Sequence, residues 1–589
     1  MTVTAQELSG VPVDHRDGMR ILWDVPVTMD DGNVLRADVF LPAADGAYPT
    51  LLSYGPYAKG LAFQEGYPSA WETMATQHPD VVEGSTNAYQ NWEVVDPEKW
   101  TVHGYAIVRV DSRGCGRSPG FVDHFSRRET QDFHDCIEWA AAEPWSDGNV
   151  GLSGVSYFGM NQWLVAATQP PHLRAICVWE GASDFYRDAS HHGGILSTFW
   201  QHWYDKQVKS VQYGLGERGP RHPVTGQLVC GDETLSDEEL AANRIDFGAE
   251  VRAHPFIDDY HRDRTPDWDR ITVPLLTAGN WGGQGLHLRG NVEGFLQAGS
   301  EQKWLEMHGL EHWTTYYMDY GREIQLQFFD HVLKGRDNGW AGRPAVQLQV
   351  RHLDDTYEER WEEAWPVPAT RWTDLHLDLT ARSLAAEPAA EPGSLSYDAM
   401  SAGVAFRTEP FAEATELTGP VAAELRVSTT AADADLFLTL RAIDPDGNHR
   451  SFVGAVDPHI PATQGWLRLS HRELDPERST PYRPVHSHTA AADVVPGTTY
   501  DVQVELWPTS LVLPAGSRLE LIVGGRDYAD TSLPPITMSN FKNQMTGCGP
   551  FLHDDPEDRP ESRFGGTVTL HAGAGSACLL RLPVVPRTT

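Results

Sequence analysis

Short apolar runs alternate with amphipathic segments through the first third of the chain. Residues 50–54 and 106–111 are apolar runs of the kind found in strands buried on both faces of a sheet. Residues 127–142 have the spacing of a helix that ends before Pro144. The alternation continues with strands at 149–154 and 174–179 and a helix at 157–168. Because strands that alternate with helices form βαβ units, the pattern predicts a mostly parallel sheet.

Residues 187–265 interrupt this alternation. They hold aromatic-rich helical stretches around Trp200 and Trp203, and a helix start at Ser236, with Glu239 three residues on as in a capping box. The alternation then resumes with strands near 273–278 and 303–308 and a helix at 319–334. Helices inserted between two strands are expected to cover the edge of the sheet as a cap.

After about residue 345 the apolar residues alternate with period two, and turns such as 444–447 separate the runs. Such runs predict an antiparallel β-sandwich. We therefore expect an α/β domain over 1–186 and 266–344, a helical cap over 187–265 and a β-sandwich over 345–589.

Composition and charge narrow the class of protein. The 589 residues are 40% hydrophobic and carry a formal net charge of -36, which suits a globular protein and disfavours nucleic acid as a partner. No apolar run reaches the ~20 residues that cross a bilayer, and the first residues lack the pattern of a signal peptide. We expect a soluble cytoplasmic protein with reduced thiols, and the patterns leave open whether it forms a homo-oligomer. The six scattered cysteines form no C-x-x-C pair: Cys115, Cys136, Cys177, Cys230, Cys548 and Cys578.

A serine stands where a predicted strand turns into a helix. The strand runs into Gly154, Ser156 occupies the turn, and the helix follows. In a nucleophile elbow this turn projects the serine hydroxyl above the edge of the sheet, and the amide of the next residue, here Tyr157, faces the oxyanion. The fifth position of the motif is usually glycine, whereas this chain has Phe158, with Gly159 one residue later. A serine that caps a helix is the alternative role.

The elbow is one of several ordered motifs spread along the chain. They read GVSYFG at 154–159, DSRGCGRS at 111–118, EPWSDGNVG at 143–151 and FFDHVLKG at 328–335. With these motifs the chain resembles the cocaine-esterase/X-prolyl dipeptidyl-peptidase family of α/β-hydrolases, whose elbow is G-x-S-Y-x-G. The resemblance implies an α/β-hydrolase sheet with an inserted cap, a C-terminal jelly-roll sandwich, and Ser156 as the nucleophile.

A serine nucleophile needs a base and an oxyanion hole. The base is expected late in the α/β domain, where His308 and His312 lie, and the resemblance favours His312. His308 falls nearer the strand, as a core histidine would. One oxyanion donor is the Tyr157 amide. The resemblance implies that the other is the hydroxyl of Tyr57, in a loop after an early strand.

The acid of the triad is missing from its usual place. The family carries Asp in a G-W-Y-D stretch, and this chain has Gly283 there. Glu180 follows the strand next to the elbow helix, so its carboxylate is expected at the same sheet edge as Ser156 and is our predicted acid. Asp184 is the second candidate, although a structural role suits it better. Glu311 adjoins His312, but neighbours on an extended segment point apart.

These residues predict a serine hydrolase that cleaves a small-molecule ester or amide through an acyl-enzyme, with no metal or organic cofactor. One alternative is an X-prolyl dipeptidyl-peptidase or an α-amino-acid-ester hydrolase or acylase, for which Asp258, Asp259 and Asp263 in the cap offer anionic groups for a substrate ammonium. The other is an inactive binding scaffold, suggested by the missing aspartate.

Overall fold

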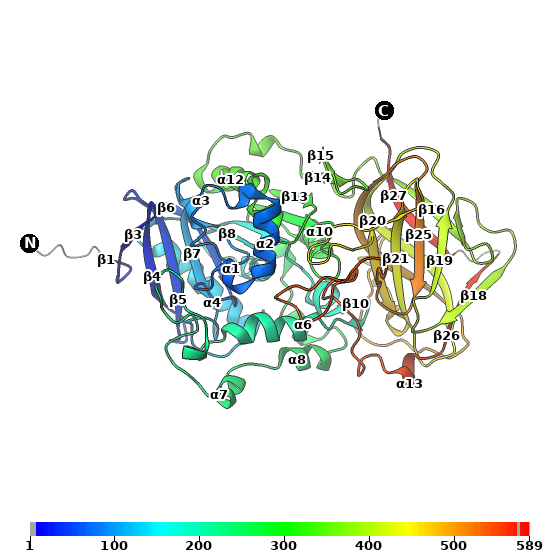
Figure 1. Ribbon diagram of the computed structural model, residues 1–589, viewed down its shortest axis with the longest axis horizontal. Coiled ribbons are helices and arrows are strands. Elements are labelled where there is room, and N and C mark those ends of the chain that lie inside the picture. The colour runs from blue at the N-terminus through cyan, green and yellow to red at the C-terminus, as the bar shows by residue number, and fades with distance from the viewer. Residues whose placement is uncertain (1–6, 574–577, 588–589) are drawn as a thin grey trace, which may run out of the picture.

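The computed structural model describes residues 7–573 and 578–587, which form two units side by side (Figure 1). The N-terminal unit, blue to green in Figure 1, contains an 11-stranded sheet, and the C-terminal unit contains a 12-stranded sheet. Two short hairpins accompany them: β1 (Glu7–Leu8) with β2 (Val11–Pro12), and β10 (His191–His192) with β11 (Ile195–Leu196).

The first sheet has the order β15-β14-β13-β12-β9-β8-β6-β7-β5-β4-β3. Its strands from β14 to β7 run parallel to their neighbours, and the strands at both edges are antiparallel. The predicted parallel sheet is therefore confirmed. Its strands are β3 (Asp14–Arg16), β4 (Met19–Thr28), β5 (Val34–Pro42), β6 (Tyr48–Gly55), β7 (Ala106–Asp111), β8 (Ser146–Val155), β9 (Leu173–Trp179), β12 (Leu275–Asn280), β13 (Lys303–His308), β14 (Val346–Arg351) and β15 (Tyr357–Glu362).

The first sheet extends beyond the predicted domain boundary at residue 345. Strand β14 pairs parallel with β13, and β15 returns antiparallel to β14. Apolar and polar residues alternate in β14 as they would in a sandwich strand, yet β14 is almost entirely buried in the first sheet. The first strand of the C-terminal unit is β16 (Arg371–Asp378).

Alternate residues of the buried strands supply two separate cores. Leu52 of β6 packs in the cluster that holds Phe133, whereas its neighbour Leu51 packs in the cluster that holds Phe328. Helices on both faces of the sheet bury these clusters. The predicted helices at 127–142 and 319–334 are confirmed as α4 (Arg127–Ala142) and α12 (Asp319–Lys334). The other helices outside the segment between β9 and β12 are α1 (Phe63–Gly66), α2 (Pro68–Gln77), η1 (Pro79–Val81), α3 (Pro97–Thr101), α5 (Tyr157–Ala167), α10 (Leu288–Gln297), α11 (Thr314–Tyr317), η7 (Trp340–Gly342), η8 (Leu469–His471) and α13 (Glu561–Phe564).

A series of short helices lies between β9 and β12, where the sequence predicts an insertion. The predicted capping box is confirmed, since the Ser236 hydroxyl accepts from the Glu239 amide and the Glu239 carboxylate accepts from the Ser236 amide. The helices are η2 (Phe185–Ser190), α6 (Phe199–Trp203), η3 (Tyr204–Val208), η4 (Lys209–Val211), η5 (Gly216–Arg218), α7 (Asp237–Ala242), α8 (Phe247–Ala253), α9 (Asp259–Arg262) and η6 (Trp268–Arg270).

The C-terminal unit encloses a separate apolar core. Its longest strand, β20, pairs with both β24 and β27, and almost all pairs are antiparallel. Its interior is lined with leucine and valine side chains from these strands. No helix in the part of the chain that the structure describes is long and apolar enough to span a bilayer. The remaining strands are β17 (Ser383–Ala385), β18 (Gly393–Asp398), β19 (Val404–Thr408), β20 (Thr415–Thr429), β21 (Asp435–Ile443), β22 (His449–Arg450), β23 (Thr463–Arg468), β24 (Tyr500–Leu513), β25 (Arg518–Gly524), β26 (Thr567–Ala572) and β27 (Leu579–Val585).

Candidate active site

Ser156 occupies a strained turn between β8 and α5. Its backbone φ of 58° and ψ of -115° lie in a region that residues other than glycine rarely adopt. Two glycines make the turn possible. A Cβ on Gly154 would lie 2.3 Å from the Cβ of Phe158, and a Cβ on Gly159 would lie 2.8 Å from the carbonyl oxygen of Trp179. The backbone therefore has the form of a nucleophile elbow, with its second small residue one place later than usual.

Two hydrogen-bond donors lie beside the serine. The Tyr57 hydroxyl accepts from Trp203 Nε1 at 2.9 Å and lines the same pocket as Ser156. Burial raises the pKa of Tyr57 well above its usual value, so this hydroxyl keeps its proton. The Tyr157 amide is at the first position of α5, where a helix leaves its N–H groups without intrahelical acceptors. Both predicted oxyanion donors thus have a proton to offer.

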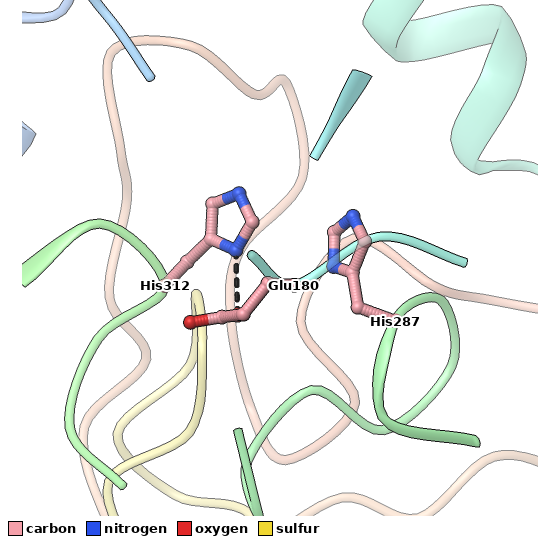
Figure 2. A group of neighbouring side chains, drawn as sticks. All are labelled: Glu180, His287 and His312. Carbon is pink, nitrogen blue, oxygen red and sulfur yellow. Dashed lines mark hydrogen bonds and ion pairs between the residues drawn. The ribbon is translucent and has the colours of Figure 1, made fainter. Parts of the chain in front are cut away.

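Glu180 and His312 are brought together. Glu180 directly follows β9 with a φ of 42°, and its Oε2 lies 2.7 Å from His312 Nδ1 (Figure 2). Both side chains are buried. The carboxylate thus reaches the predicted histidine from β9, whereas an aspartate at Gly283 would have come from the loop after β12. A Cβ on Gly283 would be only 3.2 Å from two backbone atoms, the Asn280 oxygen and the Leu288 nitrogen.

The other nitrogen of His312 does not reach the serine. His312 Nε2 lies 2.9 Å from Glu93 Oε1, so the ring is held between two carboxylates. Glu93 has a φ of 64°, and its carbonyl oxygen accepts from the Val155 amide at 3.0 Å, which places it next to the elbow. Nothing in the sequence pattern around Glu93 had singled it out, because it lies in a loop between short helices.

The imidazole in contact with Ser156 is His287. Its Nε2 lies 3.1 Å from Ser156 Oγ, and its ring is stacked on that of His312, with centroids 4.7 Å apart and planes at 15° (Figure 2). The sequence pattern did not predict a role for this residue. Its position in the sequence could have indicated a role, because it comes four residues after Gly283, in the loop that carries the family's acid.

Behind Glu180 the hydrogen bonds continue into the sheet. Glu180 Oε1 lies 3.0 Å from His308 Nε2, and His308 Nδ1 lies 2.6 Å from Glu306 Oε2. His308 is fully buried and satisfied at both nitrogens, in agreement with its expected role as a core histidine. Glu93, His312, Glu180, His308 and Glu306 thus form one chain of alternating carboxylates and imidazoles.

The groups of this chain shift one another's pKa values. Burial works against the charge of His312, but Glu180 and Glu93 raise its pKa to about 10. Burial also opposes ionisation of Glu180, yet His312 and His308 lower its pKa to about 2. Burial raises the pKa of Glu93 to about 7. His287 has no carboxylate at hydrogen-bond distance, and burial together with the His312 charge lowers its pKa well below the usual value. At neutral pH His312 is therefore a cation and His287 is neutral.

The other two candidate acids lie elsewhere. Asp184 Oδ1 accepts from the Tyr186 and Arg187 amides at the start of η2, and Oδ2 pairs with the Arg187 guanidinium at 2.7 Å. Glu311 Oε2 accepts from the Thr314 hydroxyl at 2.9 Å. Both contacts are local structural ones.

Glu180, His287 and His312 also form a group whose ligand atoms all lie within 4.8 Å of one another. The lone pair of an imidazole nitrogen lies in the plane of its ring. Because the two rings are stacked at 15°, their lone pairs do not converge on one point, as the ligands of a tetrahedral metal site must. The donor set does not fit a metal ion in this arrangement.

The site opens into an aromatic pocket between the two units. Trp92, Phe199, Trp203, Phe541 and Phe551 line it, together with Val456 of the C-terminal unit. The loop that carries Val456 also supports the histidine, since the His312 amide donates to the Ala455 carbonyl at 2.9 Å and the Ala455 amide donates to Gly282 at 3.0 Å. The C-terminal unit is therefore part of the wall of the site.

Comparisons with known proteins show which proteins the chain is similar to. The profile of the X-Pro dipeptidyl-peptidase (S15 family) matches residues 31–314, and that of the X-Pro dipeptidyl-peptidase C-terminal non-catalytic domain matches residues 338–546. The chain is 27% identical to "Cocaine esterase" from Rhodococcus sp., with 86% of this chain and 90% of that protein covered. It is 24% identical to a "Putative Xaa-Pro dipeptidyl-peptidase" from Streptomyces avermitilis, over 74% of this chain and 69% of that protein.

Solved structures resemble the chain over its whole length. A CocE/NonD family hydrolase from Staphylococcus aureus is 30% identical, covers 99% of both chains and superposes with a TM-score of 0.82. An α-amino acid ester hydrolase shares the fold, with a TM-score of 0.65 at 15% identity. The expected α/β-hydrolase fold with an all-β C-terminal domain is thereby confirmed.

Proposed function

Because the chain belongs to the CocE/NonD family of hydrolases, we propose that it cleaves a carboxylic ester or amide of a small molecule by acyl transfer through Ser156. One observation carries the proposal. Ser156 stands at a strained turn, 3.1 Å from an imidazole nitrogen and in one pocket with the Tyr57 hydroxyl. A serine becomes nucleophilic when a neighbouring base takes its proton, and such turns hold the hydroxyl in position for attack.

In the proposed reaction, Ser156 Oγ attacks the substrate carbonyl and forms an acyl-enzyme that water then hydrolyses. The Tyr57 hydroxyl and the Tyr157 amide hold the oxyanion, and the loss of one such donor costs about 2.7–4 kcal/mol of transition-state stabilisation. Glu180 is the proposed acid of the site and His312 the histidine that it orients, which the 2.7 Å bond between them supports. His312 can act as the predicted base only if its Nε2 gives up the hydrogen bond to Glu93 and forms one to Ser156.

Labelling with a fluorophosphonate tests this function directly. The wild-type protein is expected to react at Ser156, and Ser156→Ala is expected to abolish the reaction. Ser394→Ala serves as a matched control, because Ser394 is an exposed residue of β18 in the C-terminal unit. An unlabelled wild type would instead favour the inactive scaffold.

The substrate class follows from the lining of the pocket. Its aromatic side chains favour an apolar or aromatic acyl group. A second candidate activity, on α-amino-acid esters or X-prolyl peptides, is favoured by Glu93, a buried carboxylate that lines the same pocket. The acidic residues of the cap give no such support: Asp258, Asp259 and Asp263 begin and end α9 and are absent from the described lining of the pocket. Relative kcat/KM values for aryl esters, aminoacyl esters and X-Pro anilides distinguish these candidates.

The remaining partners and the compartment are proposals as well. We propose small-molecule substrates and no nucleic-acid partner, because a net charge of -36 repels phosphates. A cytoplasmic location is supported by the six cysteines, all of which are buried free thiols. Cell fractionation tests the location, and light scattering tests whether the protein forms a homo-oligomer.

A further inference from the structure

Two buried histidines stand side by side at the serine, and their hydrogen bonds differ. His312 has a carboxylate at each nitrogen, Glu180 at 2.7 Å and Glu93 at 2.9 Å. His287 has Ser156 Oγ at Nε2, at 3.1 Å, and its Nδ1 is buried with no hydrogen-bond partner in the described part of the chain. Both nitrogens of His312, the histidine expected from the family's pattern, thus contact carboxylates. The nucleophile contacts His287 instead.

The two rings also differ in the number of protons that they carry. When Glu180 and Glu93 are both ionised, His312 carries a proton on each nitrogen, so it donates two hydrogen bonds and has no lone pair for the serine proton. His287 has no carboxylate at hydrogen-bond distance and is neutral, so one of its nitrogens keeps a lone pair. The nitrogen at Ser156 is Nε2, and the tautomer with its proton on Nδ1 leaves Nε2 free to accept.

We propose that His287 is the catalytic residue that takes the proton from Ser156, and that the His312–Glu180 pair acts as a fixed charged support beside it. This inference rests on the proposed serine hydrolase function and specifies the base of that site. His312 and Glu180 are then positioning residues, because they act on the reacting atoms through the stacked ring of His287.

The local fold explains why His287 is held in this place. The loop between β12 and α10 turns tightly at Gly283, whose carbonyl accepts from the His287 and Leu288 amides, both at 3.1 Å. A Cβ on Gly283 would lie 3.6 Å from the Cβ of His287 and 3.2 Å from backbone on either side. An aspartate there would crowd this turn. The position at which the chain departs from its family's acid is therefore the turn that positions the additional histidine.

Each proton is accounted for in the proposed reaction. The Ser156 O–H bond breaks, its proton goes to His287 Nε2, and the Oγ electron pair forms a bond to the substrate carbonyl carbon, whose π pair moves onto oxygen. Collapse of this intermediate breaks the bond to the leaving group, and the leaving oxygen or nitrogen takes the proton from Nε2. Water then gives a proton to His287 and attacks the acyl carbon, and Ser156 Oγ takes the proton back as the acid departs.

Glu180 compensates the charge that develops on His287. A ring nitrogen of His287 and a Glu180 oxygen lie within 4.8 Å of each other. When His287 becomes a cation, this buried negative charge stabilises it.

The first test compares fluorophosphonate labelling rates of His287→Gln and wild type. Glutamine places an amide near Nε2 but takes up no proton, so the rate constant is expected to fall by about 10²–10⁴-fold, the usual contribution of a general base. His134→Gln is the matched control: this half-buried histidine of α4 bonds Thr168 Oγ1 at 2.8 Å, away from the described pocket lining, and should leave the rate unchanged. Added imidazole should partly restore labelling of His287→Ala, a rescue that a merely structural role would not give.

The second test uses the wild-type enzyme and does not depend on any variant folding. A base acts only when it is deprotonated. If His312, whose pKa is raised to about 10, took the serine proton, the labelling rate would rise about tenfold per pH unit between about 7.5 and 9.5. If His287 takes it, the rate is flat over that range, because its pKa lies below the usual value of a histidine.

The outcomes separate this inference from the function on which it rests. Loss of labelling in His287→Gln with a flat wild-type profile supports His287 as the base. Wild-type labelling rates in a folded His287→Gln, or a tenfold rise per pH unit in the wild type, would overturn the inference and return the role to His312. Absence of labelling in the wild type would instead contradict the proposed function.

Discussion

Glu180 is the central residue of the chain of carboxylates and imidazoles at the site. Its two oxygens contact His312 and His308, and its charge adds to that of Glu93 at His312 and of Glu306 at His308 in raising the pKa of each ring. A buried charge of this kind is tolerated because it is paired on both sides. The strained φ of Glu180, 42°, is a further sign that the fold holds this carboxylate at the sheet edge against a backbone preference.

Replacing Glu180 with glutamine is expected to reduce kcat by about 10²–10⁴-fold, because the amide removes the counter-charge of the site. Glutamine has nearly the same shape as glutamate, and His312 and His308 keep Glu93 and Glu306 as carboxylate partners, so the fold should persist. Hydrolysis of an aryl ester and near-UV circular dichroism measure the two effects.

The neighbour Glu311→Gln controls for the loss of one acidic group, since Glu311 bonds only Thr314 among the described contacts and should leave kcat unchanged. Wild-type rates in Glu180→Gln would end the assignment of the acid and direct the same test to Asp184→Asn.

Among the elements, the loop from the C-terminal unit that carries Gly454 and Ala455 packs directly against the loop between β12 and α10, which carries Gly282. A Cβ on Gly282 would lie 2.4 Å from the Cα of Gly454, so the two backbones meet where neither residue has a side chain. The Ala455 carbonyl then holds the amide of His312. A loop of the C-terminal unit thus holds a histidine in the loop that follows β13.

Gly282→Ala should therefore affect both stability and turnover. The added methyl forces the two loops apart, which is expected to cost about 1–3 kcal/mol of unfolding free energy. Because a shift of about 1 Å in a catalytic group can lower the rate by up to about 10²-fold, kcat is expected to fall between tenfold and that limit. Urea unfolding and steady-state kinetics measure the changes. Gly342→Ala is the control, since a Cβ there meets nothing within 4 Å; equal behaviour of the two variants would show that the loop contact is unimportant.

The elements themselves could largely be predicted from the sequence, because burial on both faces of a sheet gives continuous apolar runs and a helix gives its own spacing. The edge pair β14 and β15 could not, since alternation in one strand does not tell which sheet it joins. His287 could not be predicted for a different reason. Its role depends on the direction of its side chain, which lies in a loop without a periodic pattern. It also depends on its contact with Ser156, at a site where Glu93 occupies His312 Nε2, and only the structure shows these contacts.

For the whole molecule, the two units are joined by buried ion pairs as well as by the pocket. Arg289 of α10 pairs with Asp188 at 2.8 Å and with Glu505 of β24 at 2.9 Å, and its side chain is 2% exposed. A charge buried so deeply stabilises the assembly only while its partners are present. The arrangement couples the position of the C-terminal unit to the helix that follows the His287 loop.

Arg289→Met is expected to lower the free energy of unfolding by about 3–5 kcal/mol, because it leaves the buried Asp188 and the partly buried Glu505 without this counter-charge. A lower urea midpoint measures this loss. Arg262→Met provides the comparison, since the Arg262 side chain is 59% exposed and its pair with Asp259 should contribute at most about 1 kcal/mol. Equal midpoints for the two variants would contradict a structural role for the buried pair.

The central claim for the whole molecule is that turnover passes through an acyl group on Ser156. Acid quenching during turnover of an aryl ester, followed by mass spectrometry of the peptides, tests it most directly. The peptide that contains Ser156 should gain the mass of the acyl group in the wild type and not in Ser156→Ala. Turnover without an acylated peptide, or with the acyl group on another residue, would contradict the claim.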